Sequence, residues 1–278
     1  MAGQRKLSKN AWKWAFYDWA NSGFATTVMA GFFPIFFKSF WAGDLEAAQS
    51  TFVIGSVNSL IGLLIAISAP ILGAIADAGK TKKRFLFIFA ALGILATGYL
   101  FFIPESSWKL AVVFYGLGVI GFSGGNIFYD ALIVSVSSPD ERNRTSSLGF
   151  SLGYLGGGLL FLLNVAMYLY PHWFGLSGPA DAVLWSFLSV AIWWFIFSMP
   201  LLLYVKETSD LVEKENNNIV STAFTNLLST AKSVRNYKNV VIFLLAYFLY
   251  MDGVDTIIRM ATSYGSDIGL SASSMISA

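Results

Sequence analysis

The sequence contains no cysteine and a single histidine among its 278 residues. The absence of cysteine excludes disulfides, thiolate nucleophiles and cysteine-ligated metals. Charged residues are also scarce, at 12% of the chain, whereas soluble domains carry about 25%. An ordinary soluble domain is therefore excluded, and we expect no cofactor, no metal and no nucleic-acid partner.

Long apolar stretches make up most of the chain. Hydrophobic residues account for 56% of it, and its mean hydropathy is +0.63. A helix needs roughly 17 to 25 apolar residues to cross a bilayer, whereas barrel strands need only about 9 to 11 alternating ones. Six charge-free runs and a less pure seventh predict an all-α polytopic membrane protein: 19–37, 47–76, 85–104, 110–129, 145–180, 182–205 and 238–263.

The basic residues predict how these spans are oriented. With a cytoplasmic N-terminus, every lysine and arginine lies in an inner segment except Lys38, Lys109 and Arg259. This bias fits the positive-inside rule. The sequence shows no targeting signal and its linker is short, so we expect a bacterial inner membrane, with a vacuolar membrane as the alternative.

The first span also carries polar residues. Asp18 lies near its start, and Asn21 follows on a neighbouring turn of the same helix. A carboxylate in hydrocarbon costs about 2.5 to 3.5 kcal/mol on insertion scales, so an intramembrane aspartate is a candidate functional residue. Trp12, Trp14 and Trp41 flank the span, and we expect them at the two membrane interfaces.

Similar polar groups recur in the fourth and seventh spans. The triplet Phe-Tyr-Asp at 128–130 repeats the one at 16–18, a recurrence that chance explains equally well. Asp255 and Arg259 are four residues apart, so they can pair on one helix face. Nine residues are candidate substrate contacts, each with a helix-packing hydrogen bond as its alternative role: Tyr17, Asp18, Asn21, Asn126, Tyr129, Asp130, Tyr250, Asp252 and Asp255. Because apolar surroundings favour the protonated form of a carboxyl group, proton coupling is chemically available.

The turn after the second span has a distinctive order of residues. From Gly73 to Arg84 it places small residues, the acid Asp77, a glycine and then four cations. This order resembles the signature loop between the second and third helices of the major facilitator superfamily. Two departures are that the glycine follows the acid by two positions instead of three, and that Ala78 stands where a cation is common. In that family the acid and the cations latch the helix ends in one state. The resemblance implies gating roles in the loop, and we add an arginine of the next inner turn: Asp77, Gly79, Lys80, Arg84 and Arg144.

A glycine-rich run opens the fifth span. Residues 149–158 resemble the fifth-helix motif of facilitator antiporters, with Tyr154 in place of proline. Generic close packing through small residues is the alternative. We expect helix-packing roles for Gly149, Gly153, Gly156 and Gly157. Together with the stretches 17–22 and 77–84, this run resembles the autophagy-related vacuole effluxer family and its bacterial relatives. That resemblance implies export, with amino acids as the substrate class of the fungal members.

The same resemblance implies a major-facilitator-like bundle of helices that is monomeric when full length. We accordingly predict an N-terminal six-helix half over 1–205, a cytoplasmic linker with an interfacial helix over 206–237, and the first helix or two of an incomplete C-terminal half over 238–278. In the linker, apolar residues recur at helical spacing between polar ones, which is typical of a helix on a membrane surface. We expect a truncated chain, because an eighth helix begins just before its last residue.

These observations predict secondary active transport. We expect a permease or exporter of a small polar solute, with amino acids as one candidate, that works by alternating access between two halves. Its partners would be the solute, the lipid bilayer and a coupling proton. A non-transporting membrane receptor or assembly subunit is the alternative. We do not expect an enzyme, because no histidine, cysteine or paired acid stands where hydrolysis or metal binding would need it.

Overall fold

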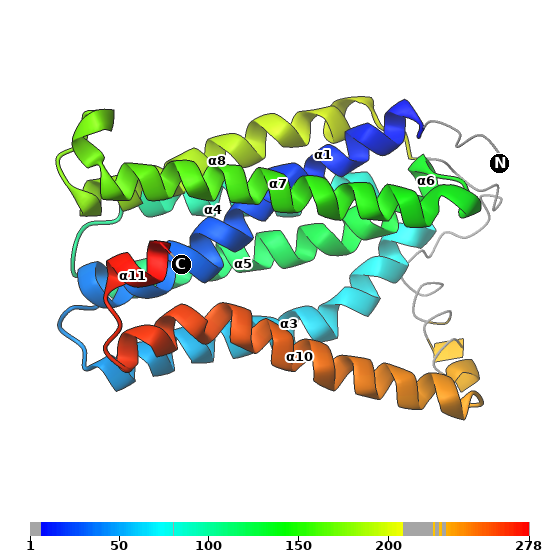
Figure 1. Ribbon diagram of the computed structural model, residues 1–278. Coiled ribbons are helices and arrows are strands. Elements are labelled where there is room, and N and C mark those ends of the chain that lie inside the picture. The colour runs from blue at the N-terminus through cyan, green and yellow to red at the C-terminus, as the bar shows by residue number, and fades with distance from the viewer. Residues whose placement is uncertain (1–6, 80, 208–224, 226–227, 230–231, 278) are drawn as a thin grey trace.

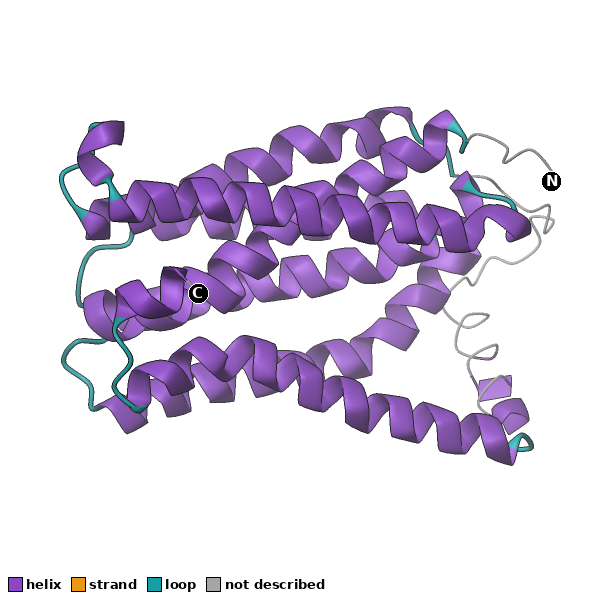
Figure 2. Ribbon diagram, viewed as in Figure 1, coloured by secondary structure: helices purple, strands orange, loops and turns teal. Residues whose placement is uncertain are grey.

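The computed structural model describes residues 7–79, 81–207, 225, 228–229 and 232–277. In this part of the chain the regular elements are all helices, joined by short loops (Figure 2). The all-α prediction is therefore confirmed. Seven helical segments among the described residues are long and apolar enough to cross a membrane: Lys9–Trp41, Ala47–Asp77, Lys82–Phe102, Trp108–Ala131, Pro139–Leu169, Pro179–Tyr204 and Lys238–Asp267.

The first span is one continuous helix with two π-helical stretches. It comprises α1 (Lys9–Gly23), a π-helical stretch η1 (Phe24–Phe32), α2 (Phe33–Phe36) and a second π-helical stretch η2 (Phe37–Trp41). Ser8 caps its start, because its hydroxyl accepts a hydrogen bond from the Ala11 N–H at 3.0 Å. Pro34 lies between the two π stretches and has no N–H to donate, so the regular α-helical ladder cannot continue through it.

The other helices follow the predicted spans closely. The fifth ends at Leu169, well before residue 180, because Pro171 and the left-handed Gly175 (φ 71°) prevent its continuation. Pro179 then occupies the first turn of the sixth, a position where its missing N–H is no loss. The elements in chain order are α3 (Ala47–Gly79), α4 (Lys82–Tyr99), η3 (Leu100–Phe102), α5 (Trp108–Ala131), α6 (Ile133–Val136), η4 (Pro139–Glu141), α7 (Arg142–Leu169), η5 (Pro171–Phe174), α8 (Pro179–Tyr204), α10 (Lys238–Asp267) and α11 (Ala272–Ser277).

The first span lies inside the bundle, where α1 packs against α7 and α8, and α4 packs against α5 (Figure 1). In lipid such helices associate through close packing and hydrogen bonds, because lipid tails are as apolar as the side chains. Aromatic rings fill much of this core. The Phe33 ring stacks on Tyr115 with centroids 3.9 Å apart, and the Trp41 ring stacks on Phe187 at 5.8 Å. Trp41, at the end of the first span, is buried among these rings, so its indole packs against protein.

The two ends of the bundle differ in charge. We call the end that carries Lys9, Lys83 and Arg142 the basic end, and the end that carries Trp41 and Trp108 the opposite end. At the opposite end α3 and α10 lie side by side, and they diverge toward the basic end (Figure 1). Large parts of both helices are exposed.

A carboxylate from beyond α8 caps the start of α4 at the basic end. The Glu207 side chain accepts the backbone N–H groups of Lys82 at 3.2 Å and Lys83 at 3.4 Å. The Lys83 ammonium in turn donates to the Val205 carbonyl at 2.7 Å. A negative charge at a helix N-terminus is favourable, so this cap joins the end of the sixth span to the start of the third. The predicted interfacial helix of the 206–237 linker lies for the most part outside the described residues.

We predict that Gly121→Ala lowers the free energy of unfolding by about 1 to 3 kcal/mol, the usual cost of overpacking. A Cβ atom at Gly121 would overlap the backbone of Gly93 and the Phe89 carbonyl, neither of which can rotate away. Gly62→Ala is the matched control, since a Cβ there would meet nothing within 4 Å. Unfolding in mixed detergent micelles measures both variants. Equal stability of the two would contradict the prediction.

Candidate functional site

A polar cluster joins the first and fourth spans toward the basic end. The Asn21 side-chain amide donates to the Asn126 side-chain carbonyl at 2.5 Å. One helical turn away on each helix, the rings of Tyr17 and Tyr129 lie 5.1 Å apart. The structure therefore brings together four of the nine candidate substrate contacts, and the two repeated Phe-Tyr-Asp triplets meet through their tyrosines.

Trp14 belongs to this cluster, although the sequence predicted it at the membrane interface. Its indole stacks on Tyr129 at 4.2 Å, and its N–H donates to the Tyr129 backbone carbonyl at 2.8 Å. The side chain is buried, so Trp14 packs against protein instead of facing lipid. Trp12, by contrast, is exposed. A tryptophan two residues further along the helix faces nearly the opposite way, so sequence proximity to the interface does not decide burial.

Asp18 faces a different helix from its neighbours. Its carboxylate accepts a hydrogen bond from the Ser22 hydroxyl at 3.2 Å. Gly153 of α7 lies directly against the pair, since a Cβ there would come within 2.9 Å of the Asp18 carboxyl carbon and 2.8 Å of the Ser22 oxygen. Asp18 is therefore partly covered between α1 and α7, one residue around the helix from Tyr17.

Several buried polar atoms of the cluster have no hydrogen-bond partner within the described residues. They are the hydroxyls of Tyr17 and Tyr129 and the side-chain carbonyl of Asn21. The indole N–H of Trp194 lies near the Tyr17 hydroxyl without hydrogen-bond geometry. An unsatisfied buried polar atom costs about 1 to 3 kcal/mol, so these atoms have capacity to bind a polar solute or water.

The glycines of α7 lie along the α1 interface. A Cβ at Gly149 would come within 2.9 Å of both the Trp14 ring and the Tyr129 hydroxyl, and one at Gly156 would come within 2.6 Å of Trp19. Gly157 lies against the backbone of Ser22 in the same way. Close helix approach at this level therefore depends on the missing side chains.

The remaining candidate contacts lie elsewhere. Tyr250 and Asp252 are exposed on α10, with Tyr250 67% exposed. Asp130 is exposed at the end of α5 but remains within electrostatic range of Asp18 and Tyr129. Asp255 forms the anticipated helical ion pair with Arg259 at 2.7 Å. Among the residues that the structure describes, no group of three histidine, aspartate or glutamate side chains could hold a metal ion.

The candidate gating residues lie at the basic end. Asp77 forms an ion pair with Lys82 at 2.7 Å, across the turn that Gly79 begins. Arg84 is exposed and lines a surface pocket of about 430 Å³ together with Lys83 and Glu207. Arg144 is exposed in the first turn of α7, and Lys80 lies outside the described residues. The acid therefore pairs with a cation that sequence reasoning did not single out.

A second ionic contact, which sequence reasoning missed, ties α10 to the bundle at the opposite end. The Lys38 ammonium donates to the Asp267 carboxylate at 2.6 Å and to the Ser263 carbonyl at 3.0 Å. Thr51 donates to the other Asp267 oxygen at 2.8 Å. Thr262 donates to the Ala30 carbonyl at 2.9 Å. The one available signal was a lysine at the end of an apolar run.

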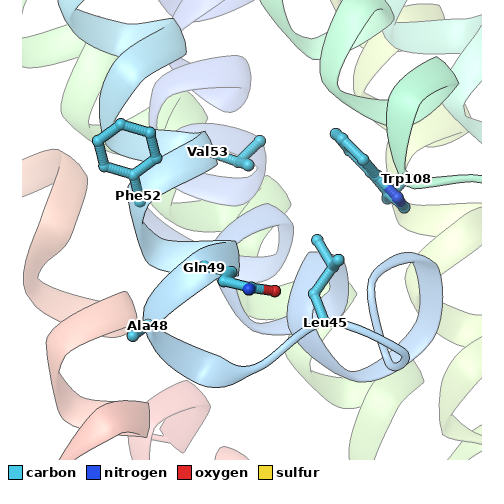
Figure 3. A pocket seen from close by; sticks show the side chains of 6 residues that line it. All are labelled: Leu45, Ala48, Gln49, Phe52, Val53 and Trp108. Atoms are coloured by element: carbon cyan, nitrogen blue, oxygen red, sulfur yellow. The ribbon is translucent and has the colours of Figure 1, made fainter.

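The opposite end also carries a surface pocket of about 390 Å³ (Figure 3). Gln49 is the one residue with a polar side chain that could bond a solute there besides the Trp108 indole. The pocket offers no charged group, and it is lined by Leu45, Ala48, Gln49, Phe52, Val53 and Trp108. It is therefore a weaker candidate for a polar-solute site than the cluster around Asn21.

Comparisons with known proteins agree with this architecture. The sequence matches the family described as "Vacuole effluxer Atg22 like" over residues 41–277. It is 40% identical to YxiO of Bacillus subtilis, described as an uncharacterized MFS-type transporter, over 98% of this chain and 64% of that protein. It is 22% identical to autophagy-related protein 22 of Yarrowia lipolytica, over 77% of this chain and 48% of that one. The chain thus spans less than two thirds of the length of these relatives.

The fold is that of the major facilitator superfamily. A crystal structure of the D-xylose-proton symporter matches with a TM-score of 0.58 and 16% sequence identity, covering 96% of this chain and 64% of the symporter. At this identity the likeness concerns the fold alone.

We predict that Asn21 and Asn126 stabilise the bundle jointly. A double-mutant cycle of Asn21→Ala and Asn126→Ala should give a coupling energy of about 0.6 kcal/mol, and up to about 1.7, as for other hydrogen bonds between membrane helices. Each single variant leaves the other amide unpaired, so the double variant should be less destabilised than the sum of the two. Unfolding in mixed micelles supplies the four free energies. Strict additivity would contradict the prediction.

Proposed function

Since the chain belongs to the vacuole effluxer Atg22-like family, we propose that it functions in secondary active transport by alternating access. Residues 1–205 form one half, 206–237 the connection and 238–278 part of the other half. The solute is small and polar, and the direction is export across a bacterial inner membrane with the N-terminus in the cytoplasm. Amino acids are the solute class that the resemblance to fungal members suggests.

The observation that supports this proposal is the asymmetric attachment of α10. Within the described residues, its hydrogen bonds and ion pair to the bundle all fall between Thr262 and Asp267, at the opposite end. The side chains from 242 to 253 are exposed. A transporter that alternates must close one end of its central path while the other is open, and the two halves must separate at one end at a time. In the predicted orientation the open end faces the cytoplasm.

The polar cluster near the basic end supplies groups for the solute and for a proton. Asp18 is a half-buried carboxylate in a membrane span, with the unpartnered hydroxyls of Tyr17 and Tyr129 on the adjacent face. Intramembrane acids of this kind commonly serve proton relays. We propose that Asp18 exchanges the coupling proton, and that Asp77, Gly79, Lys80, Arg84 and Arg144 act in closing the basic end.

A disulfide across the opposite end should stop transport. The hydroxyls of Thr51 and Ser263 are 3.4 Å apart, so Thr51→Cys with Ser263→Cys should form a disulfide on oxidation. The chain has no cysteine of its own, so no other pair competes. In proteoliposomes, exchange of labelled amino acids should fall by roughly tenfold or more on oxidation and return with reductant.

The two single-cysteine variants are the controls for this experiment. Full exchange through a completely cross-linked protein would contradict alternating access at this end. If the unmodified protein moves none of the common amino acids or other small polar solutes tested, the result would favour a membrane receptor or assembly subunit over a transporter.

The proton role of Asp18 predicts a split between two kinds of flux. Asp18→Asn keeps the hydrogen bond with Ser22 possible but cannot release a proton. Uptake or efflux driven by a pH gradient should fall by roughly tenfold or more, whereas exchange of solute for solute should persist. Asp140→Asn, at an exposed position in η4, is the matched control. Unchanged gradient-driven flux in the Asp18 variant would contradict the assignment.

A further inference from the structure

A second polar cluster lies between α3, α5 and α10, on the side of the opposite end. The Tyr115 hydroxyl donates to the side-chain carbonyl of Asn58 at 3.2 Å. The Tyr115 side chain is buried, and its ring is stacked on Phe33, so its hydroxyl is held in place. Neither Asn58 nor Tyr115 stood out in the sequence.

Arg259 of α10 completes this cluster. Its guanidinium pairs with Asp255 at 2.7 Å, but the two side chains are covered unequally: 15% of the arginine side chain is exposed against 55% of the aspartate. The guanidinium therefore lies on the side of α10 that faces the bundle, and the carboxylate lies on the more exposed side of the same helix. Tyr115 is within electrostatic range of both charges.

The pairing of α3 with α10 places Asn58 at the same level. The two helices run antiparallel, with Thr51 opposite Ser263 and Gly55 beside Met260. One turn further along α3, Asn58 is therefore level with the turn of α10 that holds Asp255. Arg259 lies between this level and Met260, so its side chain and the Asn58 amide belong to one small region.

Two buried donors of this region have no partner among the described residues: the side-chain N–H₂ of Asn58 and the Nε–H of Arg259. Buried donors are usually satisfied, and leaving a charged one unpaired is especially unfavourable. Both groups only donate, so a ligand that satisfies them must present acceptor oxygens. The planar fork of a guanidinium matches a carboxylate in particular.

We infer that Asn58 and Arg259, with Tyr115 holding the Asn58 amide in place, form a binding site for the carboxylate group of the transported solute, with Asp255 accepting an ammonium group where the solute has one. The inference rests on the proposed function and adds to it the residues that would bind the solute. The site is distinct from the cluster around Asn21, because here a guanidinium offsets the negative charge of the neighbouring carboxylate, Asp255. Because Asn58 belongs to α3 and Arg259 to α10, a carboxylate bound to both would hold these two helices together.

A matched set of ligands tests this site on the purified protein in lipid nanodiscs. L-leucine carries both groups, 4-methylpentanoate lacks the ammonium, and isopentylamine lacks the carboxylate. We expect L-leucine and 4-methylpentanoate to bind and isopentylamine not to bind, as measured by calorimetry and by the shift in melting temperature.

The variants should weaken binding in a pattern that follows charge. Arg259→Gln and Asn58→Leu should weaken carboxylate binding by roughly 10- to 100-fold. Arg259→Lys keeps the charge but loses the fork, so it should weaken binding while preserving the fold. Asp255→Asn should weaken L-leucine more than 4-methylpentanoate. Lys109→Gln, an exposed cation on α5, is the control and should leave binding unchanged.

Three binding results would overturn the site: isopentylamine binding as well as the acids, no binding of either carboxylate, or carboxylate binding that survives both Arg259→Gln and Arg259→Lys. The binding assay needs no flux, so the two proposals fail separately. Carboxylates that bind but never cross proteoliposome membranes would overturn transport and leave the site. Flux that Arg259→Gln does not alter would overturn the site and leave transport.

Discussion

Every polar side chain placed among these spans must find a partner, because hydrocarbon offers none. Most do so locally: Thr97, Ser186 and Ser198 donate to backbone carbonyls four residues earlier in their own helices. Others reach across helices, as Asn21 does to Asn126. Among the described residues, buried atoms without a partner gather around Tyr17 and recur at Asn58 and Arg259, and others stand singly, as at Thr27, Thr145 and Asn164. The distribution of unsatisfied atoms, more than any pocket in the surface, thus marks where the molecule has capacity for something besides itself.

Small residues make this arrangement fit sterically. The glycines of α7 bring this helix close enough to α1 to cover Asp18. The contact between Gly93 and Gly121 likewise allows the backbones of α4 and α5 to approach each other closely. Together with the first span, α4, α5, α7 and α8 therefore form a compact body. By contrast, α10 is held through a few polar contacts at one end. Rigid packing on one side and a narrow attachment on the other are what a rocking motion between two halves requires.

Much of the fold could be predicted from the sequence, because a bilayer demands long uncharged helices and the runs were plain to see. The ends were less predictable. The first span begins at Lys9, and Arg142 and Arg144 lie in the first turn of α7, because basic side chains at a helix end can reach the interface. The local Asp255 and Arg259 pair followed from spacing alone. The Lys38 and Asp267 pair did not, since the residues are 229 positions apart and only the packing of two spans brings them together.

The sequence indicated which residues belong to the site, but not which neighbouring helix each side chain faces. Four of the nine predicted contacts, Tyr17, Asn21, Asn126 and Tyr129, lie together, because polar side chains at equal depth in two spans have few other partners. That Asp18 faces α7, that Trp14 is buried, and that Asn58 and Tyr115 lie near Arg259 depend on helix rotation, which composition does not encode. A tyrosine or asparagine in a span is common enough that neither position stood out before its neighbours were known.

The π-helical winding between Phe24 and Phe32 changes which face of the first span each later residue occupies. Wider turns shift the angular phase of every residue that follows, so a helical wheel drawn with one period from Lys9 to Trp41 would assign wrong neighbours to its second half. The same helix thereby presents the Asn21 amide to α5 in its half toward the basic end and the Lys38 ammonium to α10 at the opposite end. An inserted or deleted residue within that stretch would reset this phase, and would uncouple the two contacts without touching either one.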